Sequence, residues 1–164
     1  MNPTSELAES THIYGSNQLL TFMIGDEEYG VDILCVQEIR AWQETMPIPK
    51  APSFIKGAIN IRGEIVPIAD LRERLGFDVR EYGPMTVVVV VRVESGNVSR
   101  LIGLVVDAMS DVRNMPDDGL REPPDLGETG NTAFARGIAV LGDKMVIVLN
   151  LEELFGPKEN SDEG

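Results

Sequence analysis

This sequence has very little of the chemistry that cysteine and histidine provide: it contains one of each, Cys35 and His12. A single cysteine cannot form an internal disulfide, which is typical of a protein in a reducing cytoplasm. One cysteine and one histidine cannot build a zinc site or a Cys/His catalytic pair. The longest apolar run, residues 85–91, is far shorter than the ~20 residues a membrane-spanning helix needs. With no signal-peptide pattern at the start, we expect a cytoplasmic protein without direct membrane insertion.

Basic residues are also scarce. The chain has 14 Lys and Arg against 27 Asp and Glu, a formal net charge of −13. Such a surface repels nucleic acid and anionic lipid, so neither is an expected partner. Residues 40–74, however, contain six basic residues and only four acidic ones. This mildly basic stretch favours an acidic protein partner.

Recognisable catalytic motifs are missing. There is no GxSxG, P-loop, dinucleotide fingerprint or HExxH. The acidic stretch "GDEEYGVD" fits a hairpin turn better than a calcium loop, which needs oxygen ligands spread over about twelve residues. Two carboxylates brought together by folding would still permit a hydrolase. We nevertheless expect a non-enzyme without cofactor or metal.

Most of the remaining sequence predicts β structure. "QLLTFMIGDEEYGVDI" alternates apolar residues around a Gly-Asp turn and predicts a hairpin. "MTVVVVVRVESGNVSRLIGLVVDAM" repeats this plan, with its turn at "ESGN". Its five consecutive valines must be covered on both faces, which places that strand at the centre of the molecule.

The two halves of the chain are similar to each other. "YGVDILCVQEIR" aligns with "IGLVVDAMSDVR" at an offset of 73, and "FIKGAINIRGEIVPIADLRERL" with "FARGIAVLGDKMVIVLNLEELF" at an offset of 80. Each copy ends in a short predicted helix, and the second has the longer, acidic loop (residues 116–131). Because such small units bury little surface alone, we expect two small five-stranded barrels sharing one core. The predicted boundaries are a tail at 1–16, a domain at 17–156 (units 18–75 and 85–155, with elements exchanged between them permitted) and a tail at 157–164.

Arg62 is out of place in the apolar stretch "INIRGEIVPI", and the second copy has Gly142 at the matching position. Either Arg62 pairs with Glu64 or Asp70 and only solubilises an edge, or it anchors a carboxylate or backbone carbonyl of a partner. We favour the anchor, since the planar guanidinium forms paired hydrogen bonds.

The segment "ILCVQEIR" is a second candidate. Ile33, Val36 and Arg40 follow the spacing of a helical turn with one presented face, although Ile33 and Val36 also fit an ordinary core. We interpret Glu38, taken alone, as a solvated carboxylate. We interpret Cys35 as a small buried apolar residue.

The motifs YGVDIxxVxEI and FIKGxxNxRGxIVPIxDL strongly resemble the CheW family of bacterial chemotaxis coupling proteins, across residues 17–156. The resemblance implies a mainly β fold with two SH3-like five-stranded barrels and short helices. It implies a non-catalytic adaptor, monomeric in isolation, which couples the cytoplasmic tips of methyl-accepting chemoreceptors to the regulatory domain of the histidine kinase CheA in receptor arrays. It assigns Ile33 and Glu38 to kinase binding. The residues it assigns to receptor binding are Val36, Glu38, Gly57, Arg62, Val87, Gly103, Met109 and Val112.

In this family scheme an apolar groove between the barrels accepts the helical receptor tip, and Arg62 fixes its register. Two alternative functions are compatible with the same fold. The chain could be a coupling module of a larger signalling protein, or it could be an adaptor of a non-flagellar chemosensory pathway.

Overall fold

The computed structural model describes residues 17–122 and 134–155, and both predicted tails lie outside these residues. Ten strands, two short α-helices and one 3-10 helix follow one another in this part of the chain. The first half contains β1 Gln18–Ile24, β2 Glu27–Asp32, η1 Ile33–Cys35, β3 Val36–Ala41, β4 Ile55–Ile61, β5 Glu64–Asp70 and α2 Leu71–Arg74. The second contains β6 Val87–Ser95, β7 Val98–Val106, β8 Ala108–Asn114, β9 Ala135–Leu141, β10 Lys144–Leu149 and α3 Leu151–Phe155.

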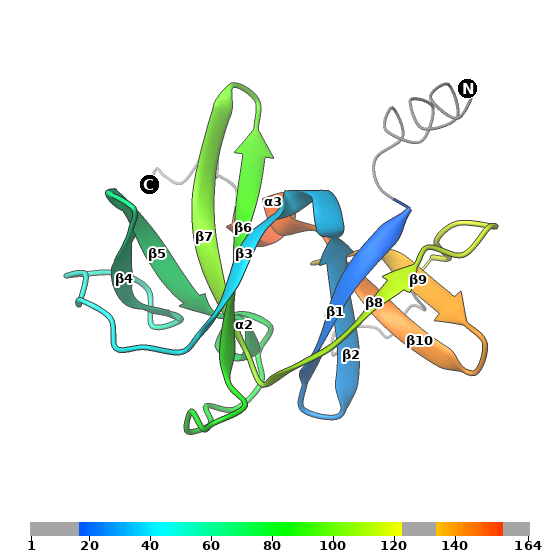
Figure 1. Cartoon of the computed structure of the whole chain (residues 1–164), viewed down its shortest axis with the longest axis horizontal. Helices are drawn as coiled ribbons and strands as arrows, with labels where there is room; N and C mark the ends of the chain where they lie inside the picture. The colour runs from blue at the N-terminus through cyan, green and yellow to red at the C-terminus, as the bar shows by residue number, and fades with distance from the viewer. Residues whose placement is uncertain (1–16, 123–133, 156–164) are drawn as a thin grey trace.

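The strands form two five-stranded sheets, each built from both halves of the chain (Figure 1). Sheet A has the order β8-β1-β2-β10-β9, and sheet B has the order β3-β6-β7-β5-β4. The first hairpin of each half thus joins the strands of the other half, through the parallel pairs β2–β10 and β5–β7. The expected class, a mainly β chain with two five-stranded SH3-like units, is confirmed.

Three apolar clusters form the core. The largest lies between the sheets and draws on both first hairpins, with Phe22 and Ile24 from β1 and Val89 and Val91 from β6. Two smaller clusters fill the inner faces of sheet B and sheet A. Successive valines of the β6 run therefore face different clusters, as the sequence required. Full burial of each such side chain stabilises the fold by roughly 1.5–3 kcal/mol.

Arg74 of α2 connects the two halves near these clusters. Its guanidinium lies over three phenylalanine rings, 5.3 Å from the centroid of Phe54, 4.6 Å from that of Phe134 and 6.0 Å from that of Phe155. Its Nε donates a hydrogen bond to the Leu154 carbonyl at 3.0 Å. Burial lowers the pKa of Arg74, so the rings and the carbonyl compensate a partly desolvated cation.

The predicted helical turn over residues 33–40 is wrong beyond its first part. The 3-10 helix η1 ends at Cys35, and Val36 already begins β3. Asp32 caps η1 by accepting a hydrogen bond from the Leu34 backbone N–H at 2.9 Å. From Val36 onward, pairing with the long strand β6 supplies backbone hydrogen bonds that a single helical turn cannot match, and it overrides the local spacing. Among the described residues, no helix has the length and apolar character needed to cross a membrane.

Candidate functional site

Arg62 lies in the tight turn between β4 and β5, where its backbone φ of 50° is left-handed and Gly63 follows with φ 91°. Its side chain is 71% exposed, and Nη2 donates a hydrogen bond to Glu38 Oε1 at 2.6 Å. The predicted alternative partners, Glu64 and Asp70, are not used. Asp70 is buried and bonds the Tyr82 hydroxyl instead. Since β3 and β4 are the two edges of sheet B, the pair connects the β4–β5 turn to the opposite edge strand.

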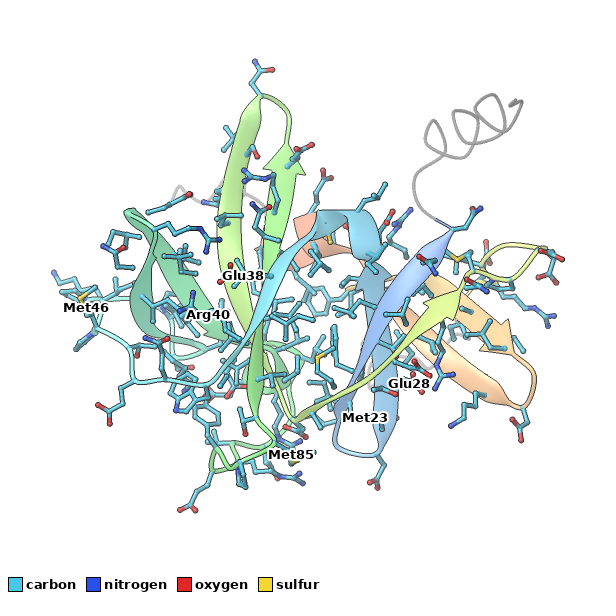
Figure 2. The ribbon with its side chains drawn as sticks, in the orientation of Figure 1. Met23, Glu28, Glu38, Arg40, Met46 and Met85 are labelled. Carbon is cyan, nitrogen blue, oxygen red and sulfur yellow. The ribbon has the colours of Figure 1, made fainter. Side chains whose placement is uncertain are left out.

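Glu38 is held between two arginines. Its Oε2 accepts a second hydrogen bond, from Arg40 Nη1 at 2.7 Å, and Figure 2 shows Glu38 and Arg40 together on β3. The hydrogen bond from Arg62, followed by that from Arg40, lowers the pKa of the Glu38 carboxyl. The carboxylate is therefore charged at neutral pH, and it orients the exposed Arg62 guanidinium. Among the described residues, Glu38 is the one hydrogen-bond partner of the Arg62 side chain, which leaves further N–H donors for a partner.

Two glycines predicted for the binding surface, Gly57 and Gly103, lie in one row with Glu38 across sheet B. In cross-strand register, Glu38 faces Val90, Val90 faces Gly103, Gly103 faces Ile68, and Ile68 faces Gly57. Both glycines are buried. A Cβ on Gly103 would lie 2.6 Å from Ile68 Cδ1, and one on Gly57 would collide with the Met46 carbonyl oxygen. Both positions thus shape the site through packing, and their effect on a partner stays a prediction.

Four other predicted residues are half-buried against the shared core: Ile33, Val36, Val87 and Met109. Their packing agrees with the ordinary-core reading of Ile33 and Val36. Met109 and Val112 lie on β8 in sheet A, so the predicted receptor-binding set is divided between the two sheets. Val112 is 44% exposed. The eight residues consequently do not form one continuous patch on sheet B.

Sequence reasoning missed two exposed apolar side chains near the site. Ile39 on β3 is 44% exposed, and Leu34 in η1 is 63% exposed. The internal alignment already contained a signal for Ile39, because the offset of 73 places it opposite Val112. Single exposed apolar side chains are normal on a protein surface, so the match between Ile39 and Val112 makes these positions candidates for contact and no more.

A cleft of about 520 Å³ lies at the junction of the two sheets, beside η1. Its lining contains Arg92 and Arg136 together with several carboxylates, so the groove is not purely apolar as expected, and Arg62 does not line it. Cys35 borders the cleft, and burial raises the pKa of its thiol to about 12. The thiol is therefore protonated at neutral pH and unsuited to act as a nucleophile.

Comparison with known proteins gives a consistent result over nearly the whole chain. The family model described as "CheW-like domain" matches residues 18–159. The chemotaxis protein CheW of Rhizobium meliloti (strain 1021) is 36% identical over 145 residues, 88% of this chain and 91% of that protein. The chemotaxis protein CheW of Klebsiella aerogenes is 39% identical over 142 residues, 87% of this chain and 83% of that protein. The crystal structure of the scaffolding protein TtCheW from Thermoanaerobacter tengcongensis superimposes with a TM-score of 0.75 at 34% identity, covering 87% of this chain and 91% of that one.

Proposed function

The chain belongs to the CheW-like domain family, and on this premise we propose that it is a non-catalytic chemotaxis adaptor. It couples the cytoplasmic tips of methyl-accepting chemoreceptors to the regulatory domain of the histidine kinase CheA. In this role it is cytoplasmic and is recruited to receptor arrays at the membrane. The observation that carries the proposal is the exposed Arg62 guanidinium, oriented by Glu38 and left with unused hydrogen-bond donors.

The receptor contact in this proposal is centred on Arg62. Its fork suits a carboxylate or backbone carbonyls on a helical receptor tip, in a paired arrangement that lysine cannot reproduce. Ile39 follows Glu38 on β3, and its exposed side chain adds apolar area on the other face of that strand, which a polar contact alone lacks. The Arg62–Glu38 ion pair forms within the free protein, so the Arg62 side chain loses less rotamer entropy when a partner binds.

In this proposal the kinase contact is at η1, and two features support it: Ile33 packs on the core and Leu34 presents an exposed side chain. Because β3 begins directly after η1, a short continuous stretch joins the two proposed contact surfaces. An adaptor needs such a rigid connection, since a flexible one would not relay the geometry of the receptor to the kinase. Glu38 lies within this stretch, which agrees with its assignment to both partners.

The test is simultaneous binding. The purified chain is mixed with a CheA-type kinase and a receptor signalling-domain assembly, and co-sedimentation is measured with receptor-dependent kinase autophosphorylation. The proposal predicts that kinase sediments with receptor only when the chain is present, and that autophosphorylation rises in the ternary mixture. If the chain binds neither partner across several such kinases and receptors, the adaptor proposal is wrong.

A further inference from the structure

The chain passes between the two sheets at two equivalent places. The first passage runs from β2 through η1 to β3, and the second runs from β7 to β8. The internal alignment places Leu34 of the first passage opposite Asp107 of the second. Leu34 is an exposed apolar side chain, whereas Asp107 is the centre of a polar network. The two passages therefore differ in how they connect the sheets.

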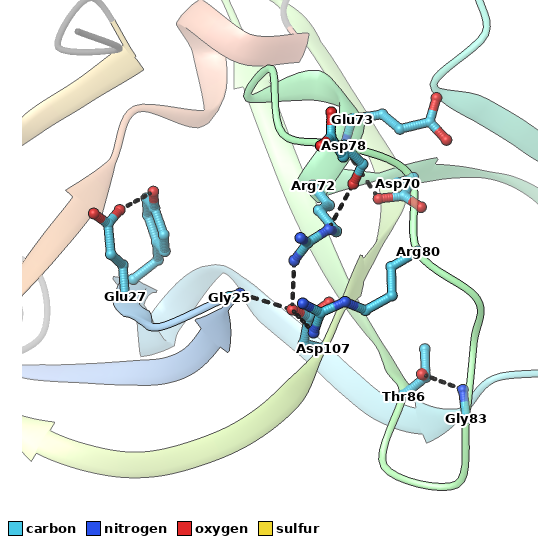
Figure 3. Close-up of polar contacts among 11 residues, drawn as sticks. Gly25, Glu27, Asp70, Arg72, Glu73, Asp78, Arg80, Gly83, Thr86 and Asp107 are labelled. Carbon is cyan, nitrogen blue, oxygen red and sulfur yellow. Dashed lines mark hydrogen bonds and ion pairs between the residues drawn. The ribbon is translucent and has the colours of Figure 1, made fainter.

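Asp107 connects three elements through one carboxylate oxygen (Figure 3). Its Oδ2 accepts hydrogen bonds from the Gly25 backbone N–H at 2.7 Å and from Arg72 Nη1 at 2.8 Å, and Arg80 Nη1 lies 3.5 Å away. The Asp107 backbone N–H donates to the Met23 carbonyl at 3.1 Å. The network thus joins the β1–β2 turn of sheet A to α2 and to the end of β7 in sheet B.

Two contacts besides Asp107 hold the Arg72 side chain in place. Its Nε donates to the Asp78 carbonyl at 2.7 Å, and its guanidinium lies over the Phe77 ring, 5.6 Å from the centroid. The side chain of Arg72 is 12% exposed and that of Asp107 is 21% exposed, so water screens the pair only partly. A charge-assisted hydrogen bond between two such groups is among the stronger polar contacts in a protein.

This network and the cleft lie at opposite ends of the same two hairpins. Gly25 lies in the turn of the β1–β2 hairpin, and η1 follows the end of β2 that is away from this turn. In the β6–β7 hairpin, Asp107 follows the last residue of β7, and Glu94 of the cleft lies near the turn at the other end. A strand of six residues spans roughly 20 Å. Figure 1 shows this arrangement, with η1 and α3 at the top and the β7–β8 passage at the bottom.

We propose that Asp107 acts as a clamp that fixes the angle between the two sheets and thereby sets the width of the cleft beside η1. The two hairpins pack on the shared core between them; the Asp107 network joins them at one end, and Arg100 Nη2 of β7 donates to the Phe155 carbonyl of α3 at 2.7 Å near the other. Releasing the clamp removes the polar connection at its end and lets the two sheets rotate about the shared core, which changes the width of the cleft. Asp107 is a positioning residue in this scheme, since it does not line the cleft. One consequence, weaker kinase binding at η1 when the clamp is released, rests on the function proposed above.

The direct test is a distance across the cleft. In a Cys35→Ser background, Glu94→Cys on sheet B and Glu152→Cys on α3 carry spin labels, and the distance distribution is measured by pulsed EPR. Both positions line the cleft. We expect one narrow distribution in the parent protein and a broadened or longer one in Asp107→Ala. Asp118→Asn is the matched control, because it removes an exposed ion pair with Arg121 and is expected to leave the distribution unchanged.

A second variant covers the case in which Asp107→Ala does not fold. Arg72→Gln removes the ion pair but leaves the Gly25 hydrogen bond to Asp107, and it is expected to broaden the distribution less. Near-UV circular dichroism establishes that each labelled protein is folded. A parent-like distribution in folded Asp107→Ala, or in folded Arg72→Gln where the alanine variant does not fold, overturns the clamp.

The functional consequence is measured separately, as the affinity of the unlabelled variants for the kinase regulatory domain. We expect Asp107→Ala to weaken binding by about fivefold or more, a common size for coupling between distant sites. A changed distance with unchanged affinity overturns the link between the clamp and η1 but not the clamp. A parent protein that does not bind the kinase refutes the proposed kinase contact, while the distance measurement still decides the clamp.

Discussion

Gly57 offers the sharpest test of how packing builds the candidate site. Its φ of 135° belongs to a region that only glycine adopts readily, at a strain of about 1–3 kcal/mol for other residues. A Cβ would also meet Thr45 Oγ1 at 2.5 Å and the Met46 carbonyl oxygen. Neither neighbour can easily withdraw, because Thr45 Oγ1 donates to the Lys56 carbonyl at 2.6 Å and Met46 exchanges two backbone hydrogen bonds with Ala58. Overpacking of this kind adds about 1–3 kcal/mol.

Gly57→Ala is therefore expected to lower the free energy of unfolding by about 2–6 kcal/mol. Gly63→Ala is the matched control, since Gly63 also has a positive φ, of 91°, but has open space around it. Its expected loss is about 1–2 kcal/mol, from backbone strain alone. Urea unfolding at 25 °C, followed by far-UV circular dichroism, measures both variants. An equal loss in the two variants would falsify the argument that close packing at Gly57 matters.

Three further predictions concern the surrounding structure. Asp70→Ala should lower the free energy of unfolding by about 2 kcal/mol or more in the same urea assay, because it removes the cap of α2 and leaves the Tyr82 hydroxyl without its acceptor. Asp70→Asn should lower the free energy of unfolding less, since the second copy caps α3 with an asparagine, Asn150. Cys35, with its pKa raised to about 12, should react with Ellman's reagent at pH 8 at least tenfold more slowly in the native protein than in urea, and equal rates would contradict its burial. Arg74→Ala should lower the free energy of unfolding by roughly 1–2 kcal/mol, measured by thermal or urea unfolding, and Arg74→Lys should lower it less. Wild-type stability in both variants would show that the contacts of Arg74 with the three phenylalanine rings do not stabilise the fold.

The fold followed from the sequence because its signals were local and repeated. The two hairpins, the buried valine run and the short helices each produce a pattern within a few residues, and the duplication gave each pattern twice. The exchange of hairpins between the sheets has no such pattern. It depends on the parallel pairs β2–β10 and β5–β7, which join residues far apart in the sequence.

The candidate site was predicted less completely, for the same physical reason. Arg62 stood out as a charge in an apolar stretch, but its partner Glu38 is 24 residues away and is brought near by the curvature of sheet B. The helical spacing of residues 33–40 was a weak local preference that pairing with β6 overrides after Cys35. The Asp107 network could not be predicted either, because it joins a turn, a helix and a strand end from separate parts of the chain.

The central claim is that Arg62, oriented by Glu38, anchors a partner of this adaptor. The most direct measurement compares wild type, Arg62→Ala and Arg62→Lys in receptor-dependent kinase autophosphorylation, after circular dichroism shows that each protein is folded. We expect clear activation by wild type, a loss of about tenfold or more in apparent affinity with Arg62→Ala, and only partial recovery with Arg62→Lys, because lysine lacks the planar fork. Activation by Arg62→Ala equal to that of wild type would contradict the claim and leave Arg62 as a solvated charge paired with Glu38.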